Sequence, residues 1–364
     1  MSEPVLELRS ISKNFGENQA LDDINLTVEH GSLIVLLGPA GAGKTTTLRI
    51  VAGLEAPSSG SIFIEGEDFT KHQPNQRDIA MIFDNLALYP NKSGFENIAS
   101  PLRIAKTPKD EINRRVHEMA GMLKIDHILD RTPATFSGGE RQRVALGRAM
   151  VRQPRFYLLD EPLSSLDFML RIDLRTELKR LQRETGQTFL FATPDYTEAL
   201  ALADTVCVLL DGRVRQIAKA QELYDDPVDR DVARFVGNPP INIMPARITR
   251  DNGTAYVSVG SMNMPLPNRL EHDLPTSVSD VEIGLRPENV RIVQQGSDAT
   301  HLTGVVNDLE PLGMHTTVGL DLEGVNLFFT VEGVQEFKDG DKIDVHVDLE
   351  SLLFFDPETG RRIS

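Results

Sequence analysis

Short apolar runs alternate with amphipathic stretches over the first two thirds of the chain. Val5–Leu8 and Ile24–Val28 alternate apolar and polar residues, as half-buried strands do. Leu33–Leu37 and Ile79–Phe83 are continuously apolar, which indicates central strands that are covered on both faces. Helical spacing between such runs, as in Thr46–Gly53, predicts a layered α/β domain.

The stretch from about residue 91 to residue 150 departs from this alternation, because its pattern is helical and polar. It predicts a helical subdomain inserted into the α/β domain. Strand and helix patterns then resume and continue to the strand predicted at Thr205–Leu210.

A segment rich in proline and glycine, Gly237–Pro240, precedes a change in the pattern of apolar and polar residues. Beyond it come short alternating runs such as Ala255–Val259 and Val281–Leu285, with turn residues between them. This pattern predicts a small all-β barrel or a pair of barrels. We therefore expect two domains, residues 1–240 and 241–364.

Composition narrows the class of protein. The chain is 40% apolar and 25% charged, which is ordinary for a soluble domain, and no apolar run approaches the roughly 18 residues of a membrane span. A single cysteine excludes an internal disulfide framework, and the polar start of the chain is unlike a secretion signal, so we expect a cytosolic protein. Residues 241–364 contain 20 acidic and 9 basic side chains and so carry −11 of the net charge of −16, which argues against a nucleic-acid partner.

The strongest chemical signal is a glycine-rich loop between a predicted strand and a predicted helix. Residues 38–45 match the pattern G-x-x-x-x-G-K-T, whose backbone N–H groups and lysine bind the phosphates of a nucleotide. The threonine offers a hydroxyl group to Mg²⁺. The residues expected to bind ATP here are Gly38, Pro39, Ala40, Gly41, Ala42, Gly43, Lys44, Thr45 and Thr46.

Two adjacent carboxylates follow the buried strand that ends near Leu159. A carboxylate at the end of such a strand is costly unless it serves an ion or a partner, so we expect Asp160 to bind Mg²⁺ together with Thr45. Glu161 is the expected catalytic residue, which polarises the attacking water. Phe15 either stacks on adenine or is an ordinary core aromatic, and the sequence leaves both possibilities open.

A second glycine motif, Ser137-Gly138-Gly139-Glu140, precedes a basic helix that reads Arg-Gln-Arg-Val-Ala-Leu-Gly-Arg-Ala over residues 141–149. With the phosphate loop, the carboxylate pair and Ser164–Asp167, it resembles the ATPase subunits of ABC transporters. The resemblance implies that two such subunits pack head to tail. Each ATP then lies between the phosphate loop of one subunit and the second glycine motif of the other, so Ser137 to Glu140 and Asp167 are expected to contact nucleotide.

The last third of the chain is similar to the accessory domain of the carbohydrate-uptake class of these transporters, which includes the maltose and glycerol-3-phosphate importers. The motifs that carry this likeness are Phe235–Pro240, Gly284–Asn289, Glu310–Gly313 and Phe355–Gly360. The resemblance implies an oligonucleotide-binding-type (TOBE-like) barrel that serves regulation and dimer contacts.

Two positions depart from the family pattern. Asp84 stands where the family usually has a glutamine that binds Mg²⁺, and Pro194 stands where it has a histidine at the γ-phosphate. Asp84 could still bind Mg²⁺ through oxygen. Proline has no side-chain donor, and deleting one transition-state donor typically costs ~10²–10³-fold in rate. We expect ATP binding with weak hydrolysis at this chain's own site.

The resemblance implies an ATP-binding subunit of an importer for a sugar or polyol, peripheral to the cytoplasmic face of the membrane. Its expected partners are two membrane permeases, which Leu86–Asn97 would contact, and a solute-binding protein. The two departures suggest a second, different ATPase subunit, whose site this chain's Ser137–Gly139 would complete. The alternatives are a nucleotide-gated regulatory subunit without useful hydrolysis, and a DNA-repair or ribosome-acting ATPase, which the acidic charge disfavours.

Overall fold

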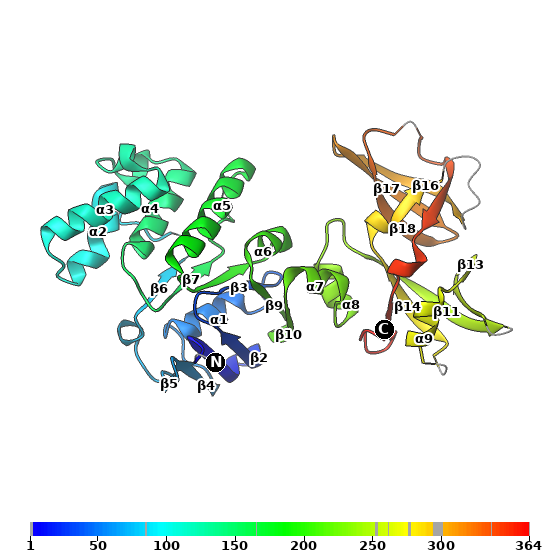
Figure 1. Ribbon diagram of the computed structural model, residues 1–364, viewed down its shortest axis with the longest axis horizontal. Helices are drawn as coiled ribbons and strands as arrows, with labels where there is room; N and C mark the ends of the chain where they lie inside the picture. Colours follow the sequence, from blue (N-terminus) through cyan, green and yellow to red (C-terminus); the bar gives the residue numbers. More distant parts are fainter. Residues whose placement is uncertain are drawn as a thin grey trace. The chain divides into compact units, whose positions relative to one another are not determined.

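The computed structural model describes residues 3–83, 86–164, 166–251, 254–260, 262–275, 278–293, 301–335 and 337–363. Contacts divide the chain into two compact units, residues 1–221 and 222–364. Figure 1 shows an α/β first unit and a largely β second unit. The expected fold class is confirmed.

The central sheet of the first unit has the strand order β10-β9-β3-β8-β7-β6, and only β10 is antiparallel to its neighbour. Every residue of β3, β7 and β8 is buried, which explains their continuous apolar sequences. The strands are β3 (Leu33–Leu37), β6 (Ile79–Ile82), β7 (Phe156–Asp160), β8 (Phe189–Thr193), β9 (Thr205–Leu210) and β10 (Arg213–Ala218).

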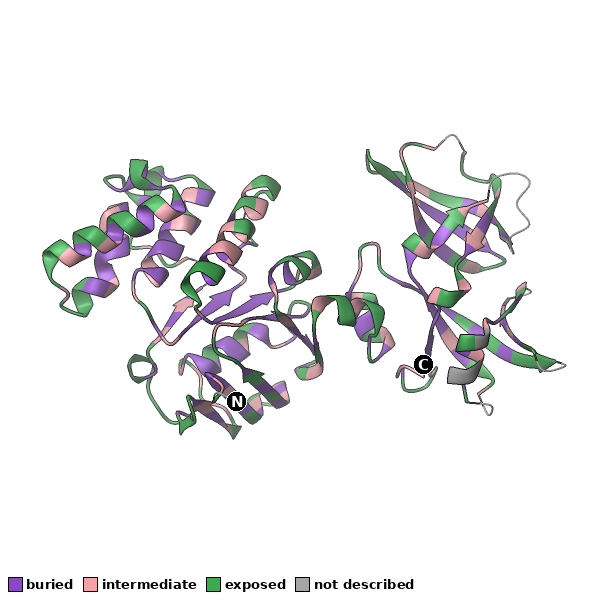
Figure 2. Cartoon of the chain, in the orientation of Figure 1, coloured by how far each residue is buried: buried purple, intermediate pink, exposed green. Residues whose placement is uncertain are grey.

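One face of this sheet is covered by helix α1 and by a smaller antiparallel sheet of order β2-β1-β4-β5. Helices α5 and α6 cover the other face (Figure 1). Purple ribbon marks the buried strands between these layers in Figure 2. The elements are β1 (Leu6–Phe15), β2 (Asn18–Val28), β4 (Ser59–Ile64), β5 (Glu67–Asp68), α1 (Lys44–Val51), α5 (Phe168–Thr185) and α6 (Tyr196–Leu202).

Three helices form the inserted helical subdomain: α2 (Gly94–Ile104), α3 (Lys109–Leu123) and α4 (Gly138–Met150). They pack on one another through buried side chains such as Ile98 and Val116. Gly147 of α4 gives this packing its close approach, because a Cβ there would lie 3.2 Å from the side chains of Ile98 and Leu123.

The second unit contains two five-stranded sheets of orders β13-β12-β11-β14-β20 and β15-β19-β16-β17-β18. Both sheets contribute to one apolar core. Its elements are α7 (Ala220–Asp225), which spans the division, α8 (Arg230–Phe235), β11 (Asn242–Asp251), β12 (Thr254–Val259), β13 (Met262–Pro265), α9 (Asn268–Asp273), β14 (Asp280–Leu285), β15 (Val290–Ile292), β16 (His301–Pro311), β17 (His315–Leu322), β18 (Val325–Glu332), β19 (Lys342–Val347) and β20 (Leu353–Phe355).

The division after residue 221 comes earlier than the domain boundary that the sequence suggests at residue 240. The physical reason is Arg286, which is only 4% exposed. Its guanidinium donates hydrogen bonds to the carbonyl oxygens of Tyr224 (2.8 Å) and Ala233 (3.1 Å), and to that of Val236. These bonds join α7 and α8 to the β-rich unit.

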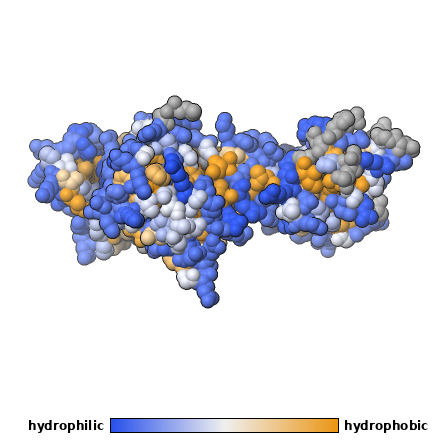
Figure 3. Space-filling view, turned by 90° about the horizontal axis from the view of Figure 1, so that it is seen from below, coloured by the Kyte–Doolittle hydropathy of each residue, from blue (hydrophilic) through white to orange (hydrophobic). Residues whose placement is uncertain are grey.

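Among the described residues, no helix is both long enough and apolar enough to cross a bilayer. On the face drawn in Figure 3, hydrophilic side chains surround smaller apolar groups.

Arg77 fixes the end of helix α1, whose beginning carries the phosphate loop. Its side chain is 2% exposed and donates to the carbonyl oxygens of Ile50 (2.9 Å) and Val51 (2.8 Å). A cation near the last carbonyls of a helix also complements its dipole. Burial lowers the pKa of Arg77 from its ordinary value.

We expect Arg77→Met to lower the free energy of unfolding of the first unit by about 2–4 kcal/mol, because two buried carbonyls lose a charged donor. Unfolding in urea, monitored by circular dichroism, measures this change in free energy. Arg49→Met is the matched control, because Arg49 lies on the same helix and is exposed. Equal, small losses in both variants would contradict the role given to Arg77.

Candidate functional site

The predicted site residues meet at one edge of the central sheet. Strands β3, β8 and β7 are parallel neighbours, with Leu37 paired to Thr193 and Asp160 paired to Ala192. The segments that follow these three strands therefore emerge side by side. Ligands of open parallel sheets bind at this carboxyl edge.

The phosphate loop needs glycine at position 43. Gly43 has φ 101°, in the left-handed region, and a Cβ there would lie 2.5 Å from the Leu21 side chain and 2.9 Å from the Ala20 carbonyl oxygen. Gly43 also caps α1, so the unpaired N–H groups of the helix start face the loop. Gly38 and Ala42 are buried, Pro39, Ala40 and Gly41 are exposed, and Thr46 lies in the first turn of α1.

Lys44 is buried, at 4% exposed, and its ammonium group has three oxygen partners. The carbonyl oxygens of Gly38 and Pro39 lie at 2.8 and 3.0 Å, and a carboxylate oxygen of Glu161 lies at 3.3 Å. A buried charge is tolerated when it is paired in this way. The same charge can pair with phosphate oxygens.

The two carboxylates occupy different environments. Asp160 is 3% exposed and accepts a 2.9 Å hydrogen bond from the Thr45 hydroxyl group, whereas the Glu161 side chain is 29% exposed. Glu161 has a positive φ of 45°, and its N–H donates to the Ala192 carbonyl oxygen at 3.0 Å. Strained backbone of this kind clusters at functional sites.

These side chains fit a magnesium–nucleotide complex by their chemistry. A threonine hydroxyl and an aspartate carboxylate are oxygen ligands of the type that Mg²⁺ selects, and a buried ammonium beside a helix start suits a triphosphate. Thr45 and Asp160 would bind the ion, which would neutralise developing phosphate charge. Glu161 is the group placed to orient a water.

The second glycine motif begins helix α4. Ser137 and Glu140 form a reciprocal capping box: the Glu140 carboxylate accepts from the Ser137 N–H at 2.7 Å, and the Ser137 hydroxyl oxygen accepts from the Glu140 N–H at 3.2 Å. The Ser137 N–H holds the pKa of Glu140 below its ordinary value, and His127 and Arg131 act in the same direction. Glu140 is thus engaged in capping, and its contact with nucleotide stays a prediction.

The two glycines of this motif have different surroundings. A Cβ on Gly139 would lie 2.7 Å from the Leu170 side chain, so a larger residue there would require Leu170 of α5 to move. A Cβ on Gly138 would meet no atom within 4 Å. Gly138 therefore leaves open space at the start of α4.

The remaining predicted residues are placed as follows. Phe15 is 47% exposed at the end of β1, with the Lys13 ammonium 4.8 Å from the ring centre, so it is not a core residue. Asp167 caps α5 by accepting from the Leu170 N–H at 3.0 Å. Asp84 lies outside the described residues. Pro194 is exposed in the turn between β8 and α6.

Sequence reasoning missed two side chains beside Pro194. Glu198 is 3% exposed and accepts a 2.7 Å hydrogen bond from the Thr193 hydroxyl, and Arg171 reaches it from α5. The spacing Asp195-x-x-Glu198 is a helix-start signal that could have indicated Glu198. Nothing local in the sequence indicates its burial or its partner on another helix.

Comparisons with known proteins agree with this geometry. A family model described as ABC transporter matches residues 21–164, and one described as TOBE domain matches residues 283–355. The chain is 42% identical over 359 residues to the sn-glycerol-3-phosphate import ATP-binding protein UgpC of Paracoccus denitrificans, with 98% of each chain covered. It is 39% identical to the trehalose/maltose import ATP-binding protein MalK of Thermococcus litoralis, covering 98% of this chain and 99% of the relative. The chain belongs to the ABC transporter ATP-binding protein family.

This ABC ATPase also resembles a solved structure, that of cbiO1 from Clostridium perfringens, part of the ABC transporter complex cbiONQ. The TM-score is 0.57 at 28% identity, and the match covers 62% of this chain and 92% of the other. The resemblance to carbohydrate importer ATPases that the motifs indicated is confirmed, as are the expected ATPase and TOBE domains.

We expect Pro194→His to raise the steady-state kcat for ATP hydrolysis by about tenfold or more, because it restores a donor at a position where such groups are worth ~10²–10³-fold. Pro194→Ala is the control, since it removes the proline ring without adding an imidazole. Equal kcat values for the two variants would show that position 194 does not limit this ABC ATPase.

Proposed function

We propose that this chain is the ATP-binding subunit of an importer for a sugar or a polyol-type solute such as glycerol 3-phosphate. The observation that carries the proposal is the similarity over 98% of the chain, through both units, to import ATP-binding proteins for sn-glycerol 3-phosphate and for trehalose/maltose. Because the names of these relatives give different solutes, we propose a class of solute and not one compound.

The expected partners are two membrane permeases and a solute-binding protein that acts through them, with this subunit at the cytoplasmic face of the membrane. A groove of about 260 Å³ between β6, α2 and α4 supports a permease contact, and Tyr89, Pro101 and Ile104 contribute to its wall. Ile104 is 79% exposed. Such apolar exposure beside a groove suits a helix from another protein.

Arg148 orders the segment next to this groove. Its guanidinium donates to the carbonyl oxygens of Leu86 (2.8 Å) and Ala87 (2.7 Å), both of which have positive φ angles. The pKa of Arg148 is lowered by burial. A segment whose backbone is held by hydrogen bonds suits the permease contact proposed for residues 86–97, because a preorganised surface loses less entropy on binding.

The finer part of the proposal is an unequal ATPase pair. It depends on the residues at positions 84 and 194, because the names of the relatives say nothing of a second ATPase. A different ATPase subunit would supply a complete phosphate-loop set, and Ser137 to Gly139 of this chain would close that site. Two copies of this chain would carry both departures in both sites.

The test of the importer proposal is uptake by cells that lack this chain. Radiolabelled glycerol 3-phosphate, glycerol, maltose and trehalose are supplied separately. We expect uptake of one of them to fall to background and to return with the wild-type gene but not with a Lys44→Ala gene, because Lys44 is the buried phosphate-loop cation. Unchanged uptake of all four solutes would contradict the proposed solute class.

The test of the shared site is Gly138→Asp. Its side chain has open space, so the subunit folds, while its charge repels a phosphate brought by the partner. We expect ATPase activity of the assembled transporter to fall at least tenfold, with the affinity of this chain's own loop for ATP unchanged. Gly138→Ala, which adds only a methyl group, is the control. Wild-type activity of Gly138→Asp would rule out a shared site at Gly138.

A further inference from the structure

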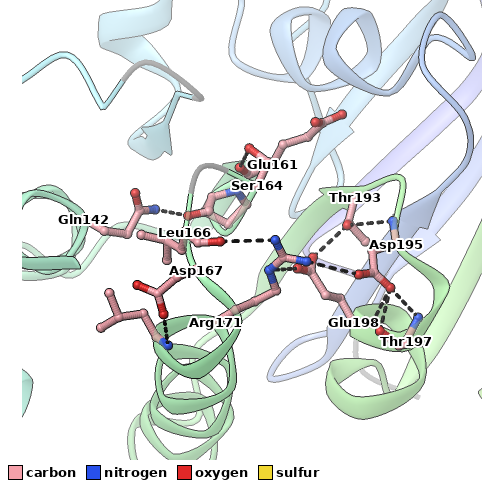
Figure 4. Close-up of polar contacts among 12 residues, drawn as sticks. Gln142, Glu161, Ser164, Leu166, Asp167, Arg171, Thr193, Asp195, Thr197 and Glu198 are labelled. Carbon is pink, nitrogen blue, oxygen red and sulfur yellow. Dashed lines mark hydrogen bonds and ion pairs between the residues drawn. The ribbon is translucent and has the colours of Figure 1, made fainter. Parts of the chain in front are cut away.

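Arg171 lies between two loops of the site that are far apart in the sequence. It stands in the first turn of α5, directly after the segment 164–167, and it faces the turn 193–195 that contains Pro194. Figure 4 shows its guanidinium between Leu166 on one side and Asp195 and Glu198 on the other.

The guanidinium has partners on both loops. One nitrogen donates to the Leu166 carbonyl oxygen at 3.2 Å, a second lies 3.5 Å from an Asp195 carboxylate oxygen, and Nε lies 3.8 Å from a Glu198 carboxylate oxygen. The Leu166 contact is a hydrogen bond, and the other two are ion-pair distances, so the planar guanidinium bonds one loop while its charge faces the carboxylates of the other.

Glu198 extends this connection to the sheet edge. Its other carboxylate oxygen accepts from the Thr193 hydroxyl at 2.7 Å, and the Thr193 hydroxyl oxygen accepts from the Asp195 N–H at 3.0 Å. The Thr193 carbonyl oxygen accepts from the N–H of Gly38, the first residue of the phosphate loop, at 3.3 Å. Both neighbours of Pro194 are thereby held by side chains.

We propose that Arg171 is a positioning residue, which links Leu166 to the turn 193–195 through Glu198 and Thr193 and so fixes the position of that turn beside the phosphate loop. The link matters in this chain because Pro194 contributes no side-chain donor of its own. The position of the turn then depends on the contacts of Thr193 and Asp195.

The surroundings of Glu198 suit this role. Burial raises the pKa of this carboxyl group, while the Thr193 hydroxyl and Arg171 lower it. The Glu198 side chain is 4% exposed and the Arg171 side chain is 30% exposed, so loss of Arg171 leaves a buried carboxylate with one cationic neighbour fewer. A change at Arg171 therefore acts on Glu198 and, through it, on Thr193. The proposal depends on the ATPase activity of the family and not on the identity of the solute.

The experiment is hydrogen–deuterium exchange of the full-length chain, with and without ATP and Mg²⁺, in wild type and Arg171→Gln. In wild type, we expect ATP to protect both the phosphate loop (residues 38–46) and the turn with the start of α6 (residues 193–198). In Arg171→Gln, we expect the loop to stay protected while ATP-dependent protection of 193–198 falls at least tenfold.

Arg183→Gln is the matched control, because Arg183 lies on the same helix and is exposed, and it is expected to behave as wild type. Arg171→Lys is expected to behave as Arg171→Gln, because one ammonium cannot serve both loops, and kcat should fall in both with KM within twofold. Protection of both regions in Arg171→Gln, or loss of both together, would overturn the proposal. Full rescue by lysine would also overturn it.

Discussion

The parallel pairing of β3, β8 and β7 is the constraint on which the site depends. It brings the ends of three buried strands to one edge of the sheet, so the phosphate loop, the Asp160–Glu161 pair and the turn at Pro194 are neighbours. A slip in register would draw the polar residues at the strand ends, Asp160 and Thr193, out of line with each other and bring them against buried apolar layers. Strand register and burial together therefore fix the relative positions of these three segments.

The charges at this edge are arranged before any ligand arrives. Lys44 is paired with two carbonyl oxygens and Glu161, and Thr45 is bonded to Asp160. Groups that are already oriented need little reorganisation when charge develops during a reaction. The described side chains thus suit nucleotide binding well, while the neighbouring turn 193–195 has proline at its centre.

Much of this could be predicted from the sequence, because the signals are local. The phosphate loop follows a buried strand, and helix α1, predicted at 46–53, occupies 44–51. The nucleotide role expected for Glu140 competes with a capping box that the Ser-x-x-Glu spacing already contains. Gly138 and Gly139 differ in the space around them, because α5 packs against Gly139 alone. The sequence of the motif does not indicate this packing.

The remaining features could not be predicted, because they join distant residues. Arg286 ties α7 and α8 to the β-rich unit across more than fifty residues, so the division at 221 precedes the change in sequence pattern at 237–240. Arg171 and Glu198 meet only because α5 and α6 lie side by side on the sheet.

We propose that this chain's own site binds ATP readily and hydrolyses it slowly because of Pro194. A single-turnover experiment, with the purified chain in excess over radiolabelled ATP and Mg²⁺, tests it most directly by timing nucleotide binding and phosphate release in one sample. The account predicts binding that is complete long before phosphate appears. Phosphate release that keeps pace with binding would contradict it.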